Sequence, residues 1–311
     1  MRYFLGIDTS NYTTSAAVYD KDSGKVTQLK KLLPVKEGER GLRQSDAVFH
    51  HTVQLPALLE ELFSYCPSPD CVAVSAMPER REGSYMPCFL VGEGAARSVA
   101  ASKNIPIHRF SHQEGHIAAA LYSAGKLELL GDKFFAFHVS GGTTQLILVT
   151  KSDSSLFNTT VLASSLDLKA GQVIDRVGVK LKLKFPAGQS LDEISLKSDK
   201  DYFTTMRCKL IGGNCSFSGL ENQADKMLRN GERECDTARF VFESIACTLC
   251  EMVRCFAEKH GSLPLVLSGG VMSNTIIRQR IGRAFPSLFA TPEFSCDNAV
   301  GVAVLSYLEE K

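Results

Sequence analysis

Residues 134–149 read Phe-Phe-Ala-Phe-His-Val-Ser-Gly-Gly-Thr-Thr-Gln-Leu-Ile-Leu-Val, and this stretch decides the fold. Two apolar runs, Phe134 to Val139 and Gln145 to Val149, flank a short turn rich in glycine and hydroxyl side chains. Such a pattern is typical of a β-hairpin. The same construction occurs near the N-terminus, where Tyr3 to Ile7 and Ala16 to Tyr19 flank the polar residues 8–15. Two hairpins of one design predict a duplicated fold with one copy in each domain.

A third turn, again rich in glycine, follows the apolar run Pro264 to Leu267 and leads into a helical segment from Thr275 to Phe285. The periodicity predicts further helices over residues 52–65, 92–103, 170–183 and 240–259. Strands and helices therefore alternate, as they do in α/β domains. A chain of 311 residues exceeds the size at which one core usually stops growing, so two domains are expected.

The glycine pairs in these turns have two explanations. Glycine relieves strain at a tight turn whether or not a ligand is present. The two glycine-rich turns and the hydroxyl-rich turn at residues 8–15, each after an apolar strand, are better explained together by backbone amides that approach a phosphate or nucleotide. The sequence lacks G-x4-G-K-[ST] and lacks a G-x-G-x-x-G that opens a helix after a strand, which excludes P-loop and Rossmann sites. The remaining arrangement resembles the clamp of actin, sugar kinases and Hsp70, where two hairpins face each other across a nucleotide cleft.

His112-Gln-Glu-Gly-His116 carries the clearest metal-binding pattern. Two imidazoles four residues apart project from one face of a helix and can bind one ion, although a third ligand must come from elsewhere. A pair of solvated or capping histidines is the alternative. A zincin protease is disfavoured, because Gln113 stands where that motif needs its glutamate, and Glu114 points about 200° away from His112 on a helix.

Composition limits the class of protein. Hydrophobic residues make up 44% and charged residues 22%, as in ordinary globular chains, and the net charge of +1 neither demands nor excludes a nucleic acid partner. We expect no signal peptide and no membrane span, so the ten cysteines are predicted to be reduced thiols in the cytoplasm. Cys247 and Cys250 form the single C-x2-C and are expected to pack in a core. Basic clusters lie at 180–184 and 278–283.

Seven motifs between residues 112 and 298 resemble in order and spacing those of the TsaD/Gcp family of tRNA threonylcarbamoyladenosine transferases, formerly called O-sialoglycoprotein endopeptidases, and the resemblance covers nearly the whole chain. They are His112-Gln-Glu-Gly-His116, Val139-Ser-Gly-Gly142, Ala170-Gly171 with Asp175, Phe185-Pro-Ala-Gly188, Ser216-Phe-Ser-Gly-Leu220, Gly269-Gly-Val271 with Asn274, and Cys296-Asp-Asn298. The resemblance implies an α/β fold of the ASKHA (actin-like ATPase) type, with two lobes around a nucleotide cleft. Residues 1–108 with the helix 297–311 would form one lobe, and residues 109–296 the other.

The resemblance also implies a site and partners. His112, His116 and Asp297 would bind one divalent metal, which could be iron, zinc or magnesium. ATP or threonylcarbamoyl-adenylate would contact nine residues, namely His138, Val139, Ser140, Gly141, Gly142, Asp175, Gly188, Gly270 and Asn274. The partners implied are tRNA, a TsaB-like homologue, a TsaE-like ATPase and a TsaC-like enzyme that supplies the adenylate. For Asp297 the residues alone leave an N-cap of the following apolar helix open.

The chain departs from the family pattern around the expected cleft. Tyr12 and Thr13 stand where the family's E-T-S-C-D-E-T has acidic residues, Thr143 replaces the histidine of S-G-G-H-T, and Gln172 replaces the glutamate of A-G-E. Leu168 replaces the second aspartate of a D-D pair, and residues 41–50 lack P-E-x-A-S-R. These changes remove groups that transfer protons or orient substrate. A divergent paralogue of the transferase, a non-catalytic nucleotide-binding scaffold and a small-molecule kinase therefore all remain open.

Overall fold

The computed structural model describes residues 1–10, 12–34 and 42–311 and contains two compact units, each built on a five-stranded sheet. Unit 1 comprises Met1–Leu127, Asp153–Leu156 and Cys296–Lys311, and unit 2 comprises Glu128–Ser152 and Phe157–Ser295. The expected boundary at 108/109 differs from this division, which assigns residues 109–127 to unit 1. The reason is that this segment continues the unit 1 sheet and then packs as a helix against the C-terminal helix.

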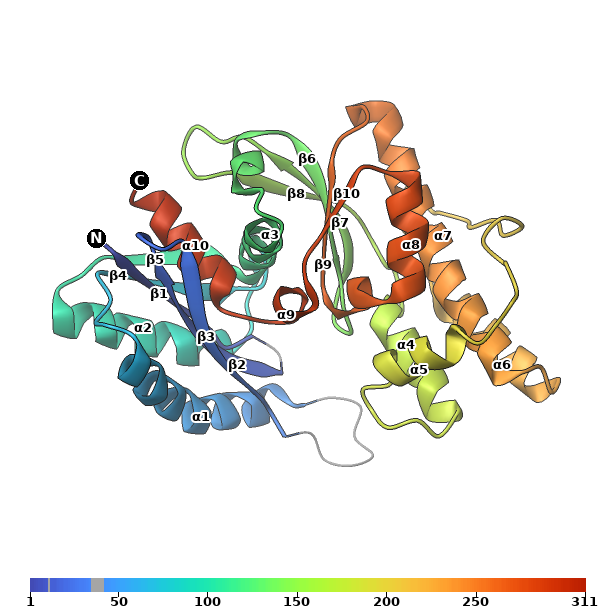
Figure 1. The fold of residues 1–311 in the computed structure, drawn as a ribbon, viewed down its shortest axis with the longest axis horizontal. Helices are drawn as coiled ribbons and strands as arrows, with labels where there is room; N and C mark the ends of the chain where they lie inside the picture. The colour runs from blue at the N-terminus through green and yellow to red at the C-terminus, as the bar shows by residue number, and fades with distance from the viewer. Residues whose placement is uncertain (11, 35–41) are drawn as a thin grey trace. The chain divides into compact units, whose positions relative to one another are not determined.

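Unit 1 is a mixed sheet with helices on both faces (Figure 1). Its strands are β1 (Tyr3–Asp8), β2 (Thr13–Asp20), β3 (Lys25–Leu32), β4 (Cys71–Met77) and β5 (Ile107–Ser111), in the order β3-β2-β1-β4-β5. Its helices are α1 (Gln44–Tyr65), α2 (Phe89–Lys103), α3 (His112–Ser123) and α10 (Val300–Glu309). Leu5 and Ile7 share a core cluster with residues of α1 and α2. Gly6 faces α10, where an added Cβ would lie 2.4 Å from the carbonyl oxygen of Ala299.

Unit 2 is also built on a mixed five-stranded sheet. Its strands are β6 (Phe134–Val139), β7 (Thr144–Thr150), β8 (Asn158–Ser164), β9 (Leu265–Ser268) and β10 (Ser287–Phe289), in the order β10-β9-β6-β7-β8. The α-helices are α4 (Ala170–Lys180), α5 (Gly188–Ser195), α6 (Ser218–Arg229), α7 (Glu234–His260), α8 (Thr275–Ala284) and α9 (Pro292–Ser295), with the 3₁₀ turns η1 (Leu127–Gly131) and η2 (Gly270–Ser273). Phe135 and Phe137 pack in one core with the apolar face of α7.

The two sheets share one topology, which confirms the predicted duplication. In unit 1, β1 pairs antiparallel with β2 and parallel with β4, and β4 pairs parallel with β5. In unit 2, β6 pairs in the same ways with β7 and β9, and β9 pairs parallel with β10. The hairpins β1–β2 and β6–β7 therefore occupy equivalent places, and each begins with a buried central strand.

Several boundaries differ from the predicted ones. Helix α1 begins at Gln44 and α7 at Glu234, both earlier than the apolar periodicity indicated. Helix α4 ends at Lys180 because Leu181 is its C-cap and Lys182 adopts a positive φ of 60°, which a helix cannot continue. All ten cysteines are free thiols, and Cys247 and Cys250 are buried in the core as expected. Among the described residues, no helix combines the length and apolar character needed to cross a bilayer.

Candidate metal centre and nucleotide-contacting turns

The two histidines of the H-x3-H motif lie in the first two turns of α3, directly after β5. The N-cap Ser111 accepts a hydrogen bond from the Glu114 amide, and the Glu114 carboxylate accepts one from the Ser111 amide at 2.6 Å. This capping box fixes where the helix begins. It places His112 at the first helical position and His116 one turn later, on the same face. Glu114 also accepts a hydrogen bond from the Arg80 side chain, so its role here is structural and the zincin reading finds no support.

Helix α10 brings the third candidate ligand to this face. It crosses α3 closely, because an added Cβ on Gly301 would lie 1.8 Å from the Gly115 carbonyl oxygen. No residue except glycine fits at that position without moving a backbone. The contact fixes the segment that precedes α10, and Asp297 lies there with its carboxylate 3.3 Å from His116 Nε2 and 3.4 Å from His112 Nε2. Helix packing thus explains the glycine at position 301, whereas a Cβ on Gly115 of H-x-E-G-H would meet nothing closer than the Val302 side chain at 3.3 Å.

The N-cap alternative for Asp297 is wrong. Helix α10 begins at Val300, and its N-cap is Ala299. The side chain that accepts the Val300 amide hydrogen is Asn298, at 3.0 Å. Asp297 therefore does not cap α10, and its carboxylate points toward the two imidazoles.

The three donor atoms have a separation that suits a single cation. His112 Nε2 and His116 Nε2 lie 2.9 Å apart, and Asp297 Oδ1 is 3.4 and 3.3 Å from them. A circle through these atoms has a radius of about 1.9 Å, slightly shorter than the usual Zn–N distance of about 2.0–2.1 Å. One ion can therefore reach all three atoms from just outside their plane. All three residues belong to unit 1.

Asp8 is a further residue of the candidate centre, and the sequence analysis did not identify it. Its Oδ2 lies 2.9 Å from His112 Nδ1, and the carboxylate also accepts hydrogen bonds from the hydroxyls of Ser10 and Ser75. A carboxylate on the far nitrogen of a histidine fixes the ring and leaves Nε2 as the electron-pair donor. The available signal was an acidic residue at the C-terminal end of the first strand, beside the expected cleft.

The electrostatics of this cluster favour a cation. Burial opposes protonation of His112, yet the carboxylates of Asp8 and Asp297 raise its pKa to about 10. Burial and the charge of His112 lower the pKa of His116, so its imidazole is the neutral one. Burial opposes ionisation of Asp297, but hydrogen bonds from both histidines hold its pKa well below the ordinary value. Two ionised carboxylates with neutral imidazoles carry a charge of −2, which one divalent ion neutralises.

In unit 2 the glycine-rich turns of two strands lie side by side. Ser140 Oγ accepts the amide hydrogens of Gly142 and Thr143, which closes the β6–β7 turn. Gly269, with a φ of 96°, approaches the end of β6 so closely that a Cβ would lie 2.2 Å from the Val139 carbonyl oxygen. For Gly269 the reason for glycine is therefore packing. Gly141 is different, because it is exposed, lacks a positive φ, and a Cβ there would meet nothing within 4 Å.

The start of α4 also packs on this turn. A Cβ on Gly171 would lie 2.7 Å from the Gly141 nitrogen, so glycine is required there. Asp175, one turn further along α4, accepts the Ala187 amide hydrogen at 2.8 Å, and burial raises its pKa. Gly188 follows as the first residue of α5.

The other predicted nucleotide contacts have defined places in unit 2. His138 and Val139 are buried at the end of β6, and Gly270 is exposed at the start of η2. Asn274 caps α8 by accepting the Ile277 amide hydrogen, and its amide nitrogen donates to Asp192 at 2.7 Å. This residue therefore has a structural role that sequence reasoning did not assign.

The departures from the family pattern are distributed over both units. In unit 1, Tyr12 is exposed and Thr13 is buried at the start of β2. In unit 2, Thr143 lies in the β6–β7 turn, and Gln172 Oε1 accepts the Lys169 amide hydrogen at the start of α4. Leu168 packs against the unit 2 core. Asn11, which stands at the cysteine of the family's E-T-S-C-D-E-T, and Gly41 of the 41–50 stretch lie outside the described residues.

Comparison with known families gives a match over most of the chain. Residues 35–304 match the TsaD family, described as tRNA N6-adenosine threonylcarbamoyltransferase. A relative from Buchnera aphidicola subsp. Schizaphis graminum, named tRNA N6-adenosine threonylcarbamoyltransferase, is 29% identical and aligns with 99% of this chain and 92% of its own length.

Solved structures with low sequence identity share the fold. Component A of the (R)-2-hydroxyglutaryl-CoA dehydratase of Acidaminococcus fermentans has a TM-score of 0.56 at 15% identity, with 99% of both chains covered. Full-length HypF in its phosphate- and nucleotide-bound form has a TM-score of 0.62 at 12% identity, covering 98% of this chain and 55% of that one. With the duplicated sheets, these similarities confirm the α/β fold of the ASKHA type.

Proposed function

The chain belongs to the tRNA N6-adenosine threonylcarbamoyltransferase family, TsaD, and on this premise we propose that it transfers threonylcarbamoyl from threonylcarbamoyl-adenylate to N6 of the adenosine beside the tRNA anticodon. In this reaction N6 forms a bond to the carbamoyl carbon and loses a proton, and AMP leaves with the electrons of the broken C–O bond. The observation that carries the proposal is the family match over residues 35–304. The assembled donor set of His112, His116 and Asp297 supports it.

A divalent metal held by His112, His116 and Asp297 would supply positive charge to the phosphate oxygens of the leaving AMP. The chain's own residues prepare that position. Asp8 holds the His112 ring through Nδ1, and the Gly115–Gly301 contact fixes the segment that carries Asp297. We favour iron or zinc, because two imidazoles and one carboxylate suit those ions better than magnesium, which prefers oxygen ligands.

The adenylate or ATP is proposed to contact the unit 2 turns. The exposed Gly141 leaves room for close approach of a phosphate to the backbone, and HypF, which shares the fold, binds nucleotide. The half-buried Asp175 carboxylate would accept hydrogen bonds from ribose hydroxyls. His138, Val139, Ser140, Gly142, Gly188, Gly270 and Asn274 complete the proposed contact set.

We place the reaction in the cytoplasm, with tRNA as acceptor substrate. A TsaB-like homologue and a TsaE-like ATPase are the proposed protein partners, and a TsaC-like enzyme would supply the adenylate.

A labelled-threonine transfer assay with bacterial partner proteins tests the activity. Because Tyr12, Thr13 and Thr143 replace groups that act as acids or bases in the family pattern, we expect transfer slower by about 10²- to 10⁴-fold than in a member with those groups. The variant Tyr12→Asp/Thr13→Glu/Thr143→His should regain rate. Fast transfer by the unmodified chain would show that the three positions are dispensable.

The natural residues Tyr12, Thr13 and Thr143, which lack the acidic groups and the imidazole of the family pattern, favour a second candidate function. This candidate is a nucleotide-binding scaffold that pairs with a homologue. No transfer by either form, together with ordinary nucleotide affinity, would support the scaffold over the transferase.

Metal analysis tests the candidate metal centre separately. His112→Ala should lose one equivalent of metal while the control His260→Ala, altered in unit 2, should keep it.

A further inference from the structure

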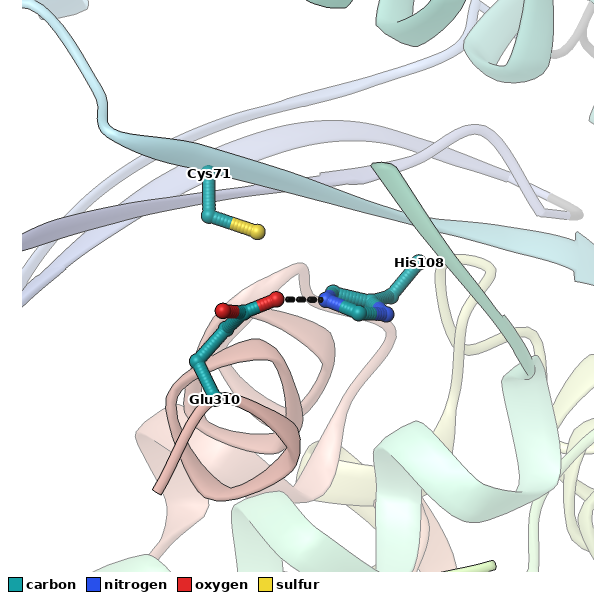
Figure 2. Close-up of side chains that lie close together, drawn as sticks. All are labelled: Cys71, His108 and Glu310. Carbon is teal, nitrogen blue, oxygen red and sulfur yellow. Dashed lines mark hydrogen bonds and ion pairs between the residues drawn. The ribbon is translucent and has the colours of Figure 1, made fainter. Parts of the chain in front are cut away.

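A second cluster of metal-ligand side chains lies in unit 1, outside the site described above. Cys71 begins β4, His108 lies in β5, and Glu310 follows the last residue of α10. Figure 2 shows the three side chains pointing toward one another. One donor atom from each, sulfur, nitrogen and oxygen, falls within 4.8 Å of the other two. We propose that Cys71, His108 and Glu310 form a zinc site.

The sulfur is held in position before any metal arrives. Cys71 is fully buried, in a strand that pairs with β1 on one side and β5 on the other. The Ser306 hydroxyl, itself buried in α10, donates to Cys71 Sγ at 3.2 Å. The thiol in turn donates toward the Pro106 carbonyl oxygen at 3.6 Å, and these hydrogen bonds orient the sulfur, as outer hydrogen bonds do for metal ligands generally. The thiolate would therefore need little rearrangement to bind.

The other two ligands can adjust to a cation. His108 Nε2 and Glu310 Oε1 lie 2.7 Å apart, and each side chain is 23% exposed. In a tetrahedral zinc site with ordinary bond lengths the donors are separated by about 3.4–3.6 Å, so this pair must open by somewhat less than about 1 Å. Glu310 lies beyond the end of α10, where its side chain can make that movement. The partial exposure leaves a fourth position for water.

Charge and ligand type select zinc. A thiolate, a carboxylate and a neutral imidazole carry a charge of −2, which a divalent ion neutralises. Sulfur disfavours magnesium and calcium, while the mixture of sulfur, nitrogen and oxygen suits zinc. In the absence of metal, the hydrogen bond with Cys71 and the nearby Glu310 outweigh burial and raise the pKa of His108 to about 9. Zinc would replace that proton.

The location gives the site a structural consequence. His108 and His112 lie on β5 and just after it, about 13 Å apart at the usual rise of a strand. Asp297 and Glu310 flank the two ends of α10. Zinc bound by Glu310 would fix the C-terminal end of α10, and Asp297 precedes the N-terminal end of the same helix. It would stabilise unit 1 without belonging to the first centre.

Cobalt substitution distinguishes the two centres, because only the proposed site contains a thiolate. In a His112→Ala/His116→Ala background, one equivalent of Co²⁺ should give a thiolate-to-cobalt charge-transfer band in the near ultraviolet. Cys71→Ser should abolish the band and His108→Ala should weaken binding at least about tenfold. Cys215→Ser, which changes an equally buried cysteine of unit 2, should leave it unchanged.

Thermal unfolding provides the second measurement. Zinc should raise the melting temperature of the double-histidine background, and this shift should disappear in Glu310→Gln or Cys71→Ser. If the double variant does not fold, Asp297→Asn replaces it as background. A folded background without the cobalt band, or a band that persists in Cys71→Ser, would overturn the proposal and leave the cluster as a hydrogen-bonded ion pair. Neither readout depends on transferase activity.

Discussion

The substitution Asp8→Asn should weaken metal binding without changing the fold. Asp8 is 1% exposed, and its Oδ2 holds His112 Nδ1 at 2.9 Å. Asparagine has nearly the same shape, and its oxygen can still accept hydrogen bonds from His112 and Ser75. Its NH2 group would then replace Oδ1, so the Ser10 hydroxyl can reverse its donor role while the hydrogen bond from the Ser10 amide is lost. What disappears is a buried negative charge opposite the ligand nitrogen. Loss of such an outer partner costs about 10- to 100-fold in metal affinity, and full burial places this case near about 100-fold, or about 2.7 kcal/mol.

Competition against a chromophoric chelator measures this loss. The titration is best made in a Cys71→Ser background, so that the second cluster contributes no binding. Asp70→Asn is the matched control, because Asp70 also lies in unit 1 and accepts backbone hydrogen bonds from Arg2 and Tyr3 without contacting the centre. A folded Asp8→Asn protein with the affinity of the Asp70→Asn control would refute the assignment of Asp8 as the residue that orients His112.

Three further expectations follow from individual positions. Gly141→Val should abolish ATP or adenylate binding in calorimetry, whereas Gly131→Val, at an equally open glycine of the same unit, should not. Gly301→Ala should cost about 1–3 kcal/mol or more in the free energy of unfolding, because its Cβ would meet a backbone oxygen, whereas Gly94→Ala in an open stretch of α2 should stabilise by about 0.5–1 kcal/mol. Burial raises the pKa of Asp167, but hydrogen bonds to its carboxylate outweigh burial and lower the pKa below the ordinary value. The ionised carboxylate therefore stabilises the folded state above about pH 4, and this stabilisation is lost as the pH falls further. Acid unfolding monitored by circular dichroism should therefore be less steep in Asp167→Asn, and equal steepness would contradict this.

The duplicated hairpins were predictable because their signal is local. In Phe134 to Val149 the apolar runs and the glycine turn lie next to each other in the sequence, and the structure places β6 and β7 almost as expected. Strands β4 and β5 were not assigned. Neither is half of a hairpin, and each joins the sheet by parallel pairing over a long connection. The sequence gives no local sign of which strand is the partner, since the partner lies tens of residues away, and these two runs lack the glycine-rich turn that marked β9.

Some residues of the candidate metal centre could likewise be predicted from local sequence, and others could not. The spacing of His112 and His116 predicted their common face, because both lie on one helix. Asp297 came from family resemblance, and sequence reasoning alone favoured a cap. The structure decides otherwise, because the N-cap is Ala299 and the Val300 amide hydrogen is accepted by Asn298, one residue from Asp297, a difference that no helix-start rule resolves. Asp8 could not be connected with His112 from sequence, since the contact joins residues 104 positions apart.

Two departures from the family pattern remove charged groups without disturbing the local structure. Gln172 keeps the hydrogen bond that a glutamate would make at the start of α4, because an amide oxygen accepts the Lys169 amide hydrogen as a carboxylate does. Only the charge is absent. Thr13 occupies a buried place at the start of β2, where an ionised side chain would require a nearby cation or substrate group to offset its desolvation. Threonine removes that requirement. Both changes are therefore neutral for the scaffold and remove negative charge, so an altered reaction rate or substrate would arise without any loss of the metal centre or the fold.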